Sequence, residues 1–297
     1  EDLVVMQRML AKADVFVSNL APGSVARMGL SGTDLRRDNP GLITCMISGY
    51  GQTGAAAKKK AYDFLIQAES GLCSVTGSAE SPARVGLSLT DLSTGLTAFS
   101  AILRALIQRG RTGQGIDLEI SMFDVLADWM NMPLLAHRYM GGAPARSGLK
   151  HSFISPYGAF ECCDGSQVLI SVQSNREFAA LCSQVLERPE LPRDPRFSEN
   201  PERYAHRDAL DAIVAACFAK FSAAEMVDKL DAAQIANAQL NSVADLSEHP
   251  FLRNSVAQIG DCEVTLAALP VTSQVGAGQR VPNLGAQSDA LRAEFKV

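Results

Sequence analysis

Short apolar runs alternate with amphipathic stretches along the first third of the chain. The runs at Asp14–Ser18 and Leu42–Ser48 are continuous and rich in β-branched residues, which predicts two buried strands. The spacing of apolar positions over Val4–Lys12 and Gly23–Met28 predicts helices beside these strands. Because helices and strands alternate, we expect an α/β fold with a mostly parallel sheet, whose ligands bind at the carboxyl ends of the strands.

The same alternation continues toward the middle of the chain. Residues 61–109 fit two helices joined by a turn that contains Asp91, and Ile116–Ile120 fits a third strand. A further helix is expected from Met122 to about Tyr139, where Gly141 and Gly142 follow it. These elements complete the expected large α/β domain.

The pattern changes after Ser152. Two short strands, Ala159–Cys162 and Val168–Val172, flank an Asp164-Gly165 pair that is typical of a hairpin turn, and three helical patterns follow them. We therefore predict a large α/β domain from residues 1–150 and 276–297, and a smaller α+β domain from residues 151–275.

Composition narrows the classes of function. The chain has 297 residues, a net charge of -5 and a pI near 5.5, which argues against binding to nucleic acid or to an anionic membrane surface. Its apolar runs are too short for a membrane span, and Glu1 and Asp2 open the chain without a basic or hydrophobic leader, so we expect a cytoplasmic location.

Cysteine and histidine spacing gives no support for a metal site. The seven cysteines are scattered without a C-x-x-C pair, and the four histidines form no H-E-x-x-H motif. We expect neither a bound metal nor a disulfide framework.

Asp91 is the first candidate for chemistry. An apolar run precedes it and an apolar helical pattern follows it, so we expect its carboxylate to face the free N–H groups at the start of that helix and to stay ionised. Two interpretations remain open from these residues alone. Asp91 is either a helix cap or a nucleophilic carboxylate that becomes acylated.

The run Lys58–Lys60 is the second candidate. Three consecutive lysines fit either a solvated loop or an anion-binding site. Tyr62 and Asp63, which follow, fit the start of an amphipathic helix.

Seven collinear segments together resemble the family III CoA-transferases, the group that includes formyl-CoA and carnitine CoA-transferases and the α-methylacyl-CoA racemases. The segments cover nearly the whole chain. They are Ala13–Gly23, Ser48–Gly54, Ala61–Asp63, the Asp91 turn, Thr112–Asp117, Ser155–Phe160 and Pro282–Gly285.

The resemblance implies a Rossmann-like large domain, an interlaced homodimer, and coenzyme A or acyl-CoA as a substrate with no permanently bound cofactor. It implies that Asp91 is the nucleophile, which forms an aspartyl anhydride and then an aspartyl-CoA thioester before CoA passes to an acceptor acid. It also implies that Gly141 and Gly142 belong to a mobile loop that shields the anhydride from water. The CoA contacts that it implies are Asn19, Leu20, Arg27, Lys60, Tyr62 and Met122.

The residue at position 62 distinguishes the racemases of the family from its transferases. The racemases carry a histidine there, whereas this chain has Tyr62, a poor base near neutral pH, so the resemblance favours transfer over racemisation. The segments Tyr62–Leu72 and Leu230–Ala238 look most like the branch that acts on mesaconyl, itaconyl, citramalyl and succinyl groups. The alternatives are an acyl-CoA racemase and a truncated, catalytically silent CoA-binding protein.

The chain departs from the family pattern in three places. Family members begin with a further strand and helix that carry CoA contacts, so the resemblance implies that part of the CoA site lies outside this sequence. Ala21 stands where the family has a basic residue, which predicts weaker phosphate binding at that point. The segment Ala55–Lys60 is unlike the family sequence before the tyrosine.

Overall fold

The computed structural model describes residues 2–271 and 279–295. By its internal contacts the chain divides into two compact units, one of Glu1–Arg146 with Leu284–Val297 and one of Ser147–Asn283. The boundary expected between residues 275 and 276 falls outside the described residues. Each unit is described by itself below.

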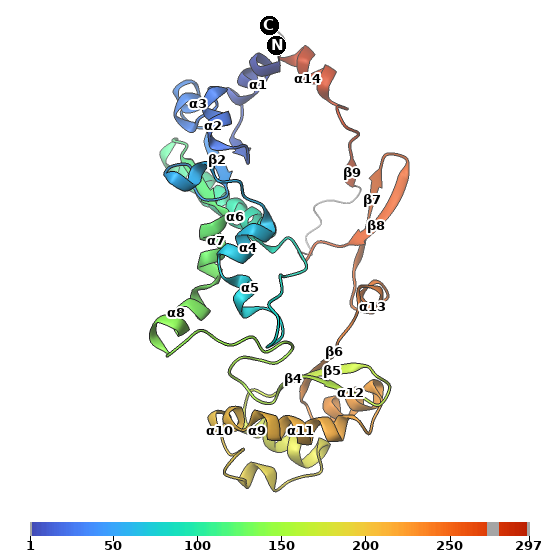
Figure 1. The fold of residues 1–297 in the computed structure, drawn as a ribbon. Helices are drawn as coiled ribbons and strands as arrows, with labels where there is room; N and C mark the ends of the chain where they lie inside the picture. Colours follow the sequence, from blue (N-terminus) through green and yellow to red (C-terminus); the bar gives the residue numbers. More distant parts are fainter. Residues whose placement is uncertain (1, 272–278, 296–297) are drawn as a thin grey trace. The chain divides into compact units, whose positions relative to one another are not determined.

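The first unit is built on a parallel sheet, as predicted. Its strands are β1 (Val15–Ser18), β2 (Ile43–Ser48) and β3 (Asp117–Ser121), and they pair in the order β1-β2-β3. The central strand β2 is labelled in Figure 1. The central strand β2 is buried along most of its length, which explains its continuous apolar sequence.

Helices connect and cover these strands. Leu10, Leu30 and Leu35 pack with Leu42 and Met46 to form the core beside α1–α3, and α6 lies against β2 and β3. The helical elements of this unit are α1 (Asp2–Leu10), α2 (Pro22–Arg27), α3 (Gly32–Asp38), the 3-10 helix η1 (Ala55–Lys58), α4 (Asp63–Glu69), α5 (Leu72–Val75), α6 (Leu89–Thr112), α7 (Met122–Trp129), α8 (Asn131–Tyr139) and α14 (Ser288–Glu294).

The single helix expected from Met122 to Tyr139 is wrong, because the structure has two helices with Met130 between them. Pro133 lies in the first turn of α8, where a missing N–H costs least. A proline at this position favours a new helix start over a continuous helix.

One face of α6 is apolar and open to solvent in this chain. Leu92, Leu96, Phe99, Leu103 and Ile107 recur every three or four residues, so they lie on the same side of the helix. Their exposed fractions run from 45% to 63%. The same helix also carries buried positions, among them Ala98 and Ala105. Such a long stripe is typical of an interaction surface.

The second unit contains the α+β arrangement that the sequence predicts. An antiparallel sheet has the strand order β4-β5-β6, and its core includes Phe160, Ile170, Phe178, Phe197 and Phe218. The elements are β4 (Tyr157–Glu161), β5 (Gln167–Ser171), β6 (Ala236–Gln239), α9 (Asn175–Ala180), η2 (Leu181–Val185, a π-helix), η3 (Leu191–Arg193), α10 (Asn200–Ala205), α11 (Arg207–Phe218) and α12 (Ala223–Ala232).

A buried arginine organises the loops of this unit. Arg203 is 2% exposed, and its guanidinium donates to the carbonyl oxygens of Ser155 at 3.0 Å and Phe197 at 3.1 Å and to Asn175 Oδ1 at 2.9 Å. It also lies over the Phe178 ring at 4.5 Å. Burial lowers the pKa of Arg203 from its ordinary value.

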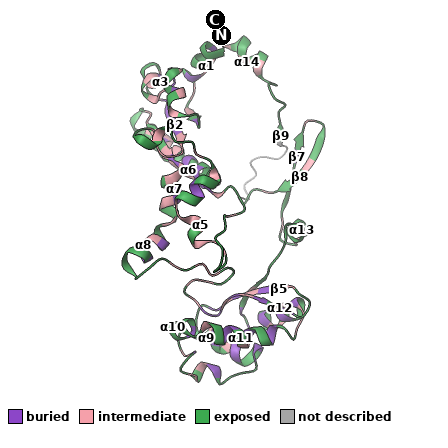
Figure 2. Cartoon of the chain, viewed as in Figure 1, coloured by how far each residue is buried: buried purple, intermediate pink, exposed green. Residues whose placement is uncertain are grey.

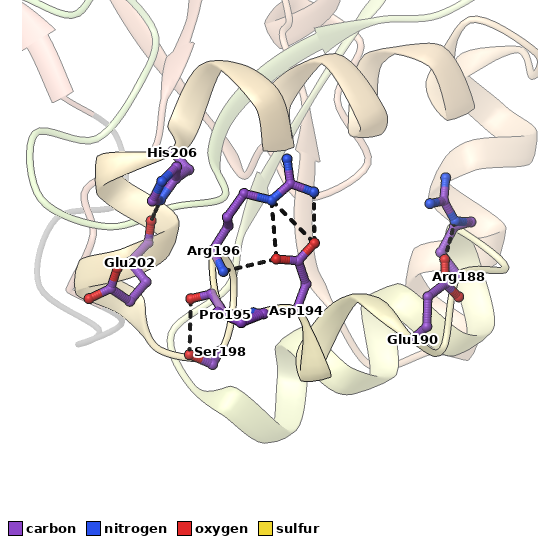
Figure 3. Close-up of polar contacts among 8 residues, drawn as sticks. All are labelled: Arg188, Glu190, Asp194, Pro195, Arg196, Ser198, Glu202 and His206. Carbon is purple, nitrogen blue, oxygen red and sulfur yellow. Dashed lines mark hydrogen bonds and ion pairs between the residues drawn. The ribbon is translucent and has the colours of Figure 1, made fainter.

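Nearby, Asp194 and Arg196 form a bidentate pair (Figure 3). The Arg196 guanidinium and N–H hold the pKa of Asp194 at about 2. This ion pair and the neighbouring Arg188–Glu190 ion pair both lie at the surface of the unit.

The sequence reading missed the hairpin β7 (Asn254–Ile259) and β8 (Cys262–Ala267), with β9 (Gln279–Val281) beside it, and the short helix α13 (Val243–Ser247). Most of the hairpin is exposed (Figure 2). Its sequence nevertheless carries a hairpin signal that the expected elements leave out, because Cys262, Val264 and Leu266 alternate with polar residues after the turn Gly260-Asp261. Across the described part of the chain, no helix combines the length and apolarity needed to cross a bilayer.

Candidate active site

A cavity of about 940 Å³ lies in the first unit, at the carboxyl ends of β1, β2 and β3. Its position agrees with the rule that ligands of open parallel sheets bind at these strand ends. The structure brings seven of the predicted site residues together on its wall. They are Asn19, Leu20, Arg27, Lys60, Tyr62, Asp91 and Met122.

The topology of the sheet explains why distant residues meet here. Asn19 and Leu20 follow the end of β1, and Met122 is the first residue of α7, directly after β3. Lys60 and Tyr62 come from the segment between β2 and α4. All three strand ends therefore contribute to one site.

Asp91 lies in the first turn of α6, but it does not cap the helix. The expectation that its carboxylate faces the free N–H groups is wrong, because the Asp63 carboxylate occupies that place. Asp63 Oδ1 accepts hydrogen bonds from the backbone N–H of Thr90 at 2.7 Å and of Asp91 at 3.4 Å. The cap-only interpretation of Asp91 therefore loses its structural basis.

Asp63 is itself held by a buried glutamine. Gln67 is fully buried, and its Nε2 donates to Asp63 Oδ2 at 2.8 Å while its Oε1 accepts from the Val85 N–H at 3.0 Å. The Thr90 hydroxyl also donates to the Asp63 carbonyl oxygen at 3.2 Å. This network ties the start of α4 to the start of α6 and so fixes the helix turn that carries Asp91.

The Asp91 carboxyl has no hydrogen bond or ion pair with another described residue. Loss of water around the carboxyl group, and then the negative charge of Asp63, raise the pKa of Asp91 above its ordinary value of 3.8. The carboxylate is uncommitted and more basic than an ordinary aspartate, as a nucleophile requires.

The cavity wall also carries cations. Arg27 donates to the neighbouring Ser24 hydroxyl at 2.9 Å, and within the described ranges no carboxylate pairs with Arg27, Lys58 or Lys60. Together with the acidic pair, these cations give the cavity one anionic and one cationic region. The cationic region suits phosphate groups.

The two glycines expected to shield the site lie at the end of α8. Gly141 and Gly142 have φ angles of 86° and 154°, which only glycine adopts readily, and neither lines the cavity. Their role as a mobile loop stays a prediction. Tyr62 lines the cavity with 69% of its surface exposed, and its role also stays a prediction.

No cluster of three or more His, Cys, Asp or Glu side chains able to hold a metal ion occurs among residues 2–271 and 279–295. The titratable side chains that line the cavity are those of Asp63, Asp91, Arg27, Lys58, Lys59, Lys60 and Tyr62.

Comparison with known proteins identifies the family. The model of CoA-transferase family III matches residues 1–288. The chain belongs to CoA-transferase family III. It is 36% identical to the acetyl-CoA:oxalate CoA-transferase of Acetobacter aceti over 99% of this chain and 77% of that protein. It is 35% identical to the mouse succinyl-CoA:glutarate CoA-transferase over 85% of this chain and 58% of that protein.

Two solved structures share this fold. A CaiB/BaiF family protein from Brucella suis has a TM-score of 0.82 and 29% identity, over 99% of this chain and 78% of that one. A protein from M. tuberculosis has a TM-score of 0.83 at 23% identity, over 97% of this chain and 79% of that one, which supports the fold alone.

Several residues on the wall of this cavity were missed as site residues. Asp63 reads as a plain helix start, and its spacing of four residues from Gln67 was the available signal. Thr94 lies one helical turn after Asp91, and its buried hydroxyl has no partner among the described residues. Lys58 was seen only as part of the lysine run.

Proposed function

We propose that this chain is a CoA-transferase that moves CoA between small carboxylic acids, with Asp91 as its nucleophile. One observation carries the proposal. A single cavity holds an aspartate whose pKa is raised and a set of cations, and among the described residues neither the aspartate nor these cations have a partner of opposite charge. A CoA thioester needs both regions, because its phosphates are anionic and its carbonyl carbon is the target of the nucleophile.

In the proposed reaction, the Asp91 carboxylate attacks the thioester carbonyl, the C–S bond breaks, and CoA leaves as a thiolate. The thiolate then attacks the Asp91 carbonyl of the anhydride and releases the donor acid as a carboxylate. The acceptor carboxylate attacks the resulting aspartyl-CoA thioester, and CoA passes to the acceptor through a second anhydride. Each step exchanges one acyl bond, so the sequence consumes no water.

Small dicarboxylic acids are the proposed acyl groups. Relatives of this chain are named for oxalate, glutarate, mesaconate and D-citramalate as acceptors, several with succinyl-CoA as donor. The uncommitted cations of the cavity support binding of the CoA phosphates. We propose succinyl-CoA as the donor with which to begin.

We also propose that the enzyme is a homodimer. The apolar stripe on α6, from Leu92 to Ile107, is the observation that supports it. Leaving five large apolar side chains in water is unfavourable, and a second copy of the same stripe would bury them.

The function is tested by incubating the protein with succinyl-CoA and a dicarboxylic acceptor in deuterated water. We expect a new CoA thioester of the acceptor and no deuterium at the α-carbon, since Tyr62 is a poor base near neutral pH. Deuterium incorporation without formation of a new thioester would overturn transfer in favour of racemisation. A protein that binds CoA but yields neither product would be a silent binder.

A further inference from the structure

The three lysines at the cavity differ in what they contact. Lys59 Nζ donates to Glu69 Oε1 at 2.6 Å and Oε2 at 2.5 Å, and it lies over the Tyr50 ring at 4.7 Å. The Tyr50 hydroxyl donates to the same Glu69 carboxylate. Lys58 and Lys60 have no such contacts in the part of the chain that the structure describes, although both line the cavity. We call Tyr50, Lys59 and Glu69 the clamp.

The clamp connects three separate elements of the first unit. Tyr50 follows β2, Lys59 follows η1, and Glu69 is the last residue of α4. The Tyr50 ring also packs on Phe123 of α7, with ring centroids 5.9 Å apart. The clamp therefore fixes the loop of residues 50–60 to the helices around the cavity.

The base of the same loop is closed by a tight backbone approach. A Cβ atom at Gly49 would lie 2.2 Å from the Ala61 Cβ, so only glycine fits at position 49. A loop whose ends meet and whose side chains pack on its neighbours is a compact Ω-loop. With its ends and its Lys59 side chain held, the loop presents Lys58 and Lys60 from a fixed backbone.

The charges of the clamp reinforce one another. Hydrogen bonding to Glu69 raises the pKa of Lys59, and the same contact lowers the pKa of Glu69. Burial, and then hydrogen bonding to Glu69, raise the pKa of Tyr50. The clamp thus stays in one charge state across neutral pH, and its lysine is already neutralised by a carboxylate.

We propose that Lys59 is a positioning residue, which with Glu69 and Tyr50 holds the loop so that Lys58 and Lys60 bind the phosphate groups of the CoA substrate. The proposal rests on the proposed function and adds Lys58 to its binding residues. In this proposal Lys59 has a structural role, whereas Lys58 and Lys60 bind the substrate.

The direction in which Glu69→Gln changes CoA affinity distinguishes this proposal from the alternative in which Lys59 itself binds phosphate. If Lys59 bound phosphate directly, Glu69→Gln would free its ammonium and remove a nearby negative charge, so CoA would bind more tightly. If Lys59 positions the loop, Glu69→Gln loosens the loop, and the dissociation constant for CoA rises by about two- to fivefold. Lys58→Met should raise it by about tenfold or more, since it removes a charge-assisted contact.

The test combines calorimetry of CoA binding with amide hydrogen exchange in the free protein. The Lys59 N–H donates to the Ala56 carbonyl oxygen at 2.9 Å and reports on the loop. We expect faster exchange at this amide in Glu69→Gln, unchanged exchange in Lys58→Met, and parent values of both readouts in the control Glu80→Gln. Binding of pantetheine, which lacks the phosphates, should not change in any variant.

Each result of these two measurements decides a different part of the proposal. Tighter CoA binding in Glu69→Gln, or unchanged exchange at the Lys59 amide in that variant, would overturn the positioning role. If the parent protein bound no CoA, the proposed function and the phosphate contacts would fail together, while the exchange measurement would still decide whether the clamp orders the loop.

Discussion

Asp63, in the first turn of α4, accepts a hydrogen bond at 2.7 Å from the backbone N–H of Thr90, the residue before Asp91. The Asp63 carboxylate thus occupies the free N–H groups of α6, and the Asp91 carboxylate has no hydrogen-bond or ion-pair partner in the part of the chain that the structure describes. The two residues divide the roles that a single aspartate at a helix start would have to combine. Asp63 orders the turn, and Asp91 is available for chemistry.

Asp63→Asn should shift the pH dependence of turnover. The Asp63 charge is the second cause of the raised pKa of Asp91, so removing it should move the acid limb of kcat/KM to lower pH. The amide nitrogen of asparagine cannot accept from Gln67, so we also expect a loss of about 1 kcal/mol in the free energy of unfolding. A pH–rate profile and urea unfolding measure the two effects.

Asp124→Asn is the matched control, because Asp124 also lies in the first turn of a helix, α7, but does not line the cavity. An acid limb that stays in place in Asp63→Asn would show that the charge of Asp63 does not act on Asp91.

Asp91→Asn should remove turnover without destabilising the protein at neutral pH. The pKa of Asp91 is raised in the folded protein, so the ionised carboxyl is less favourable there than in the unfolded chain once the pH exceeds 3.8. A neutral asparagine avoids this cost at pH 7, and its advantage should vanish as the pH falls below 3.8. Urea unfolding at several pH values tests whether Asp91→Asn raises or lowers the free energy of unfolding. A clear loss of stability at pH 7 would restore the capping role.

Arg27→Ala and Lys60→Ala should each raise the KM for acyl-CoA more than they lower kcat. Both side chains line the basic part of the cavity without a carboxylate partner among the described residues, so each loss should be about 1–3 kcal/mol. Steady-state kinetics measures the split, with the exposed Lys220→Ala as the control. Unchanged KM in both variants would mean that these cations face solvent and bind no phosphate.

The dimer proposal predicts that polar substitutions on α6 change the state of assembly. Leu96→Gln combined with Phe99→Gln interrupts the centre of the apolar stripe, so the dimer should dissociate at concentrations where the parent stays associated. Sedimentation equilibrium gives the dissociation constant. A parent protein that sediments as a monomer would refute the proposal directly.

The sequence predicts the elements that have a clear pattern of burial. The strand β2 is found because its residues are apolar and mostly buried, and β1 is found from the same kind of apolar run although Val17 is 49% exposed. The capping box of Ser222 and Glu225 marks the start of α12, one of the three helices expected in the second domain. The hairpin β7–β8 is missed although Cys262, Val264 and Leu266 alternate with polar residues in β8 and Gly260-Asp261 forms a two-residue turn before it. An alternating pattern indicates a strand but not how far it is buried, since Leu266 of β8 is 45% exposed in the structure.

The site was predictable as a set of residues but not as a set of contacts. Asp91 is recognisable from its place at a helix start, yet the group that caps this helix, Asp63, is 28 positions away in the sequence. The run Lys58–Lys60 looks uniform, and only the approach of Glu69 distinguishes the middle lysine. Such contacts depend on how α4, α6 and the loop after β2 meet.

The intact mass of the protein after incubation with an acyl-CoA tests the central claim most directly. We predict an added mass equal to CoA less one water, from a thioester on Asp91, and its conversion by hydroxylamine to a hydroxamate that peptide mapping locates at residue 91. The adduct should be absent from Asp91→Asn and retained in Asp124→Asn. Turnover by a parent protein that carries no adduct under these conditions, or an adduct that persists in Asp91→Asn, would contradict the assignment of Asp91 as the nucleophile.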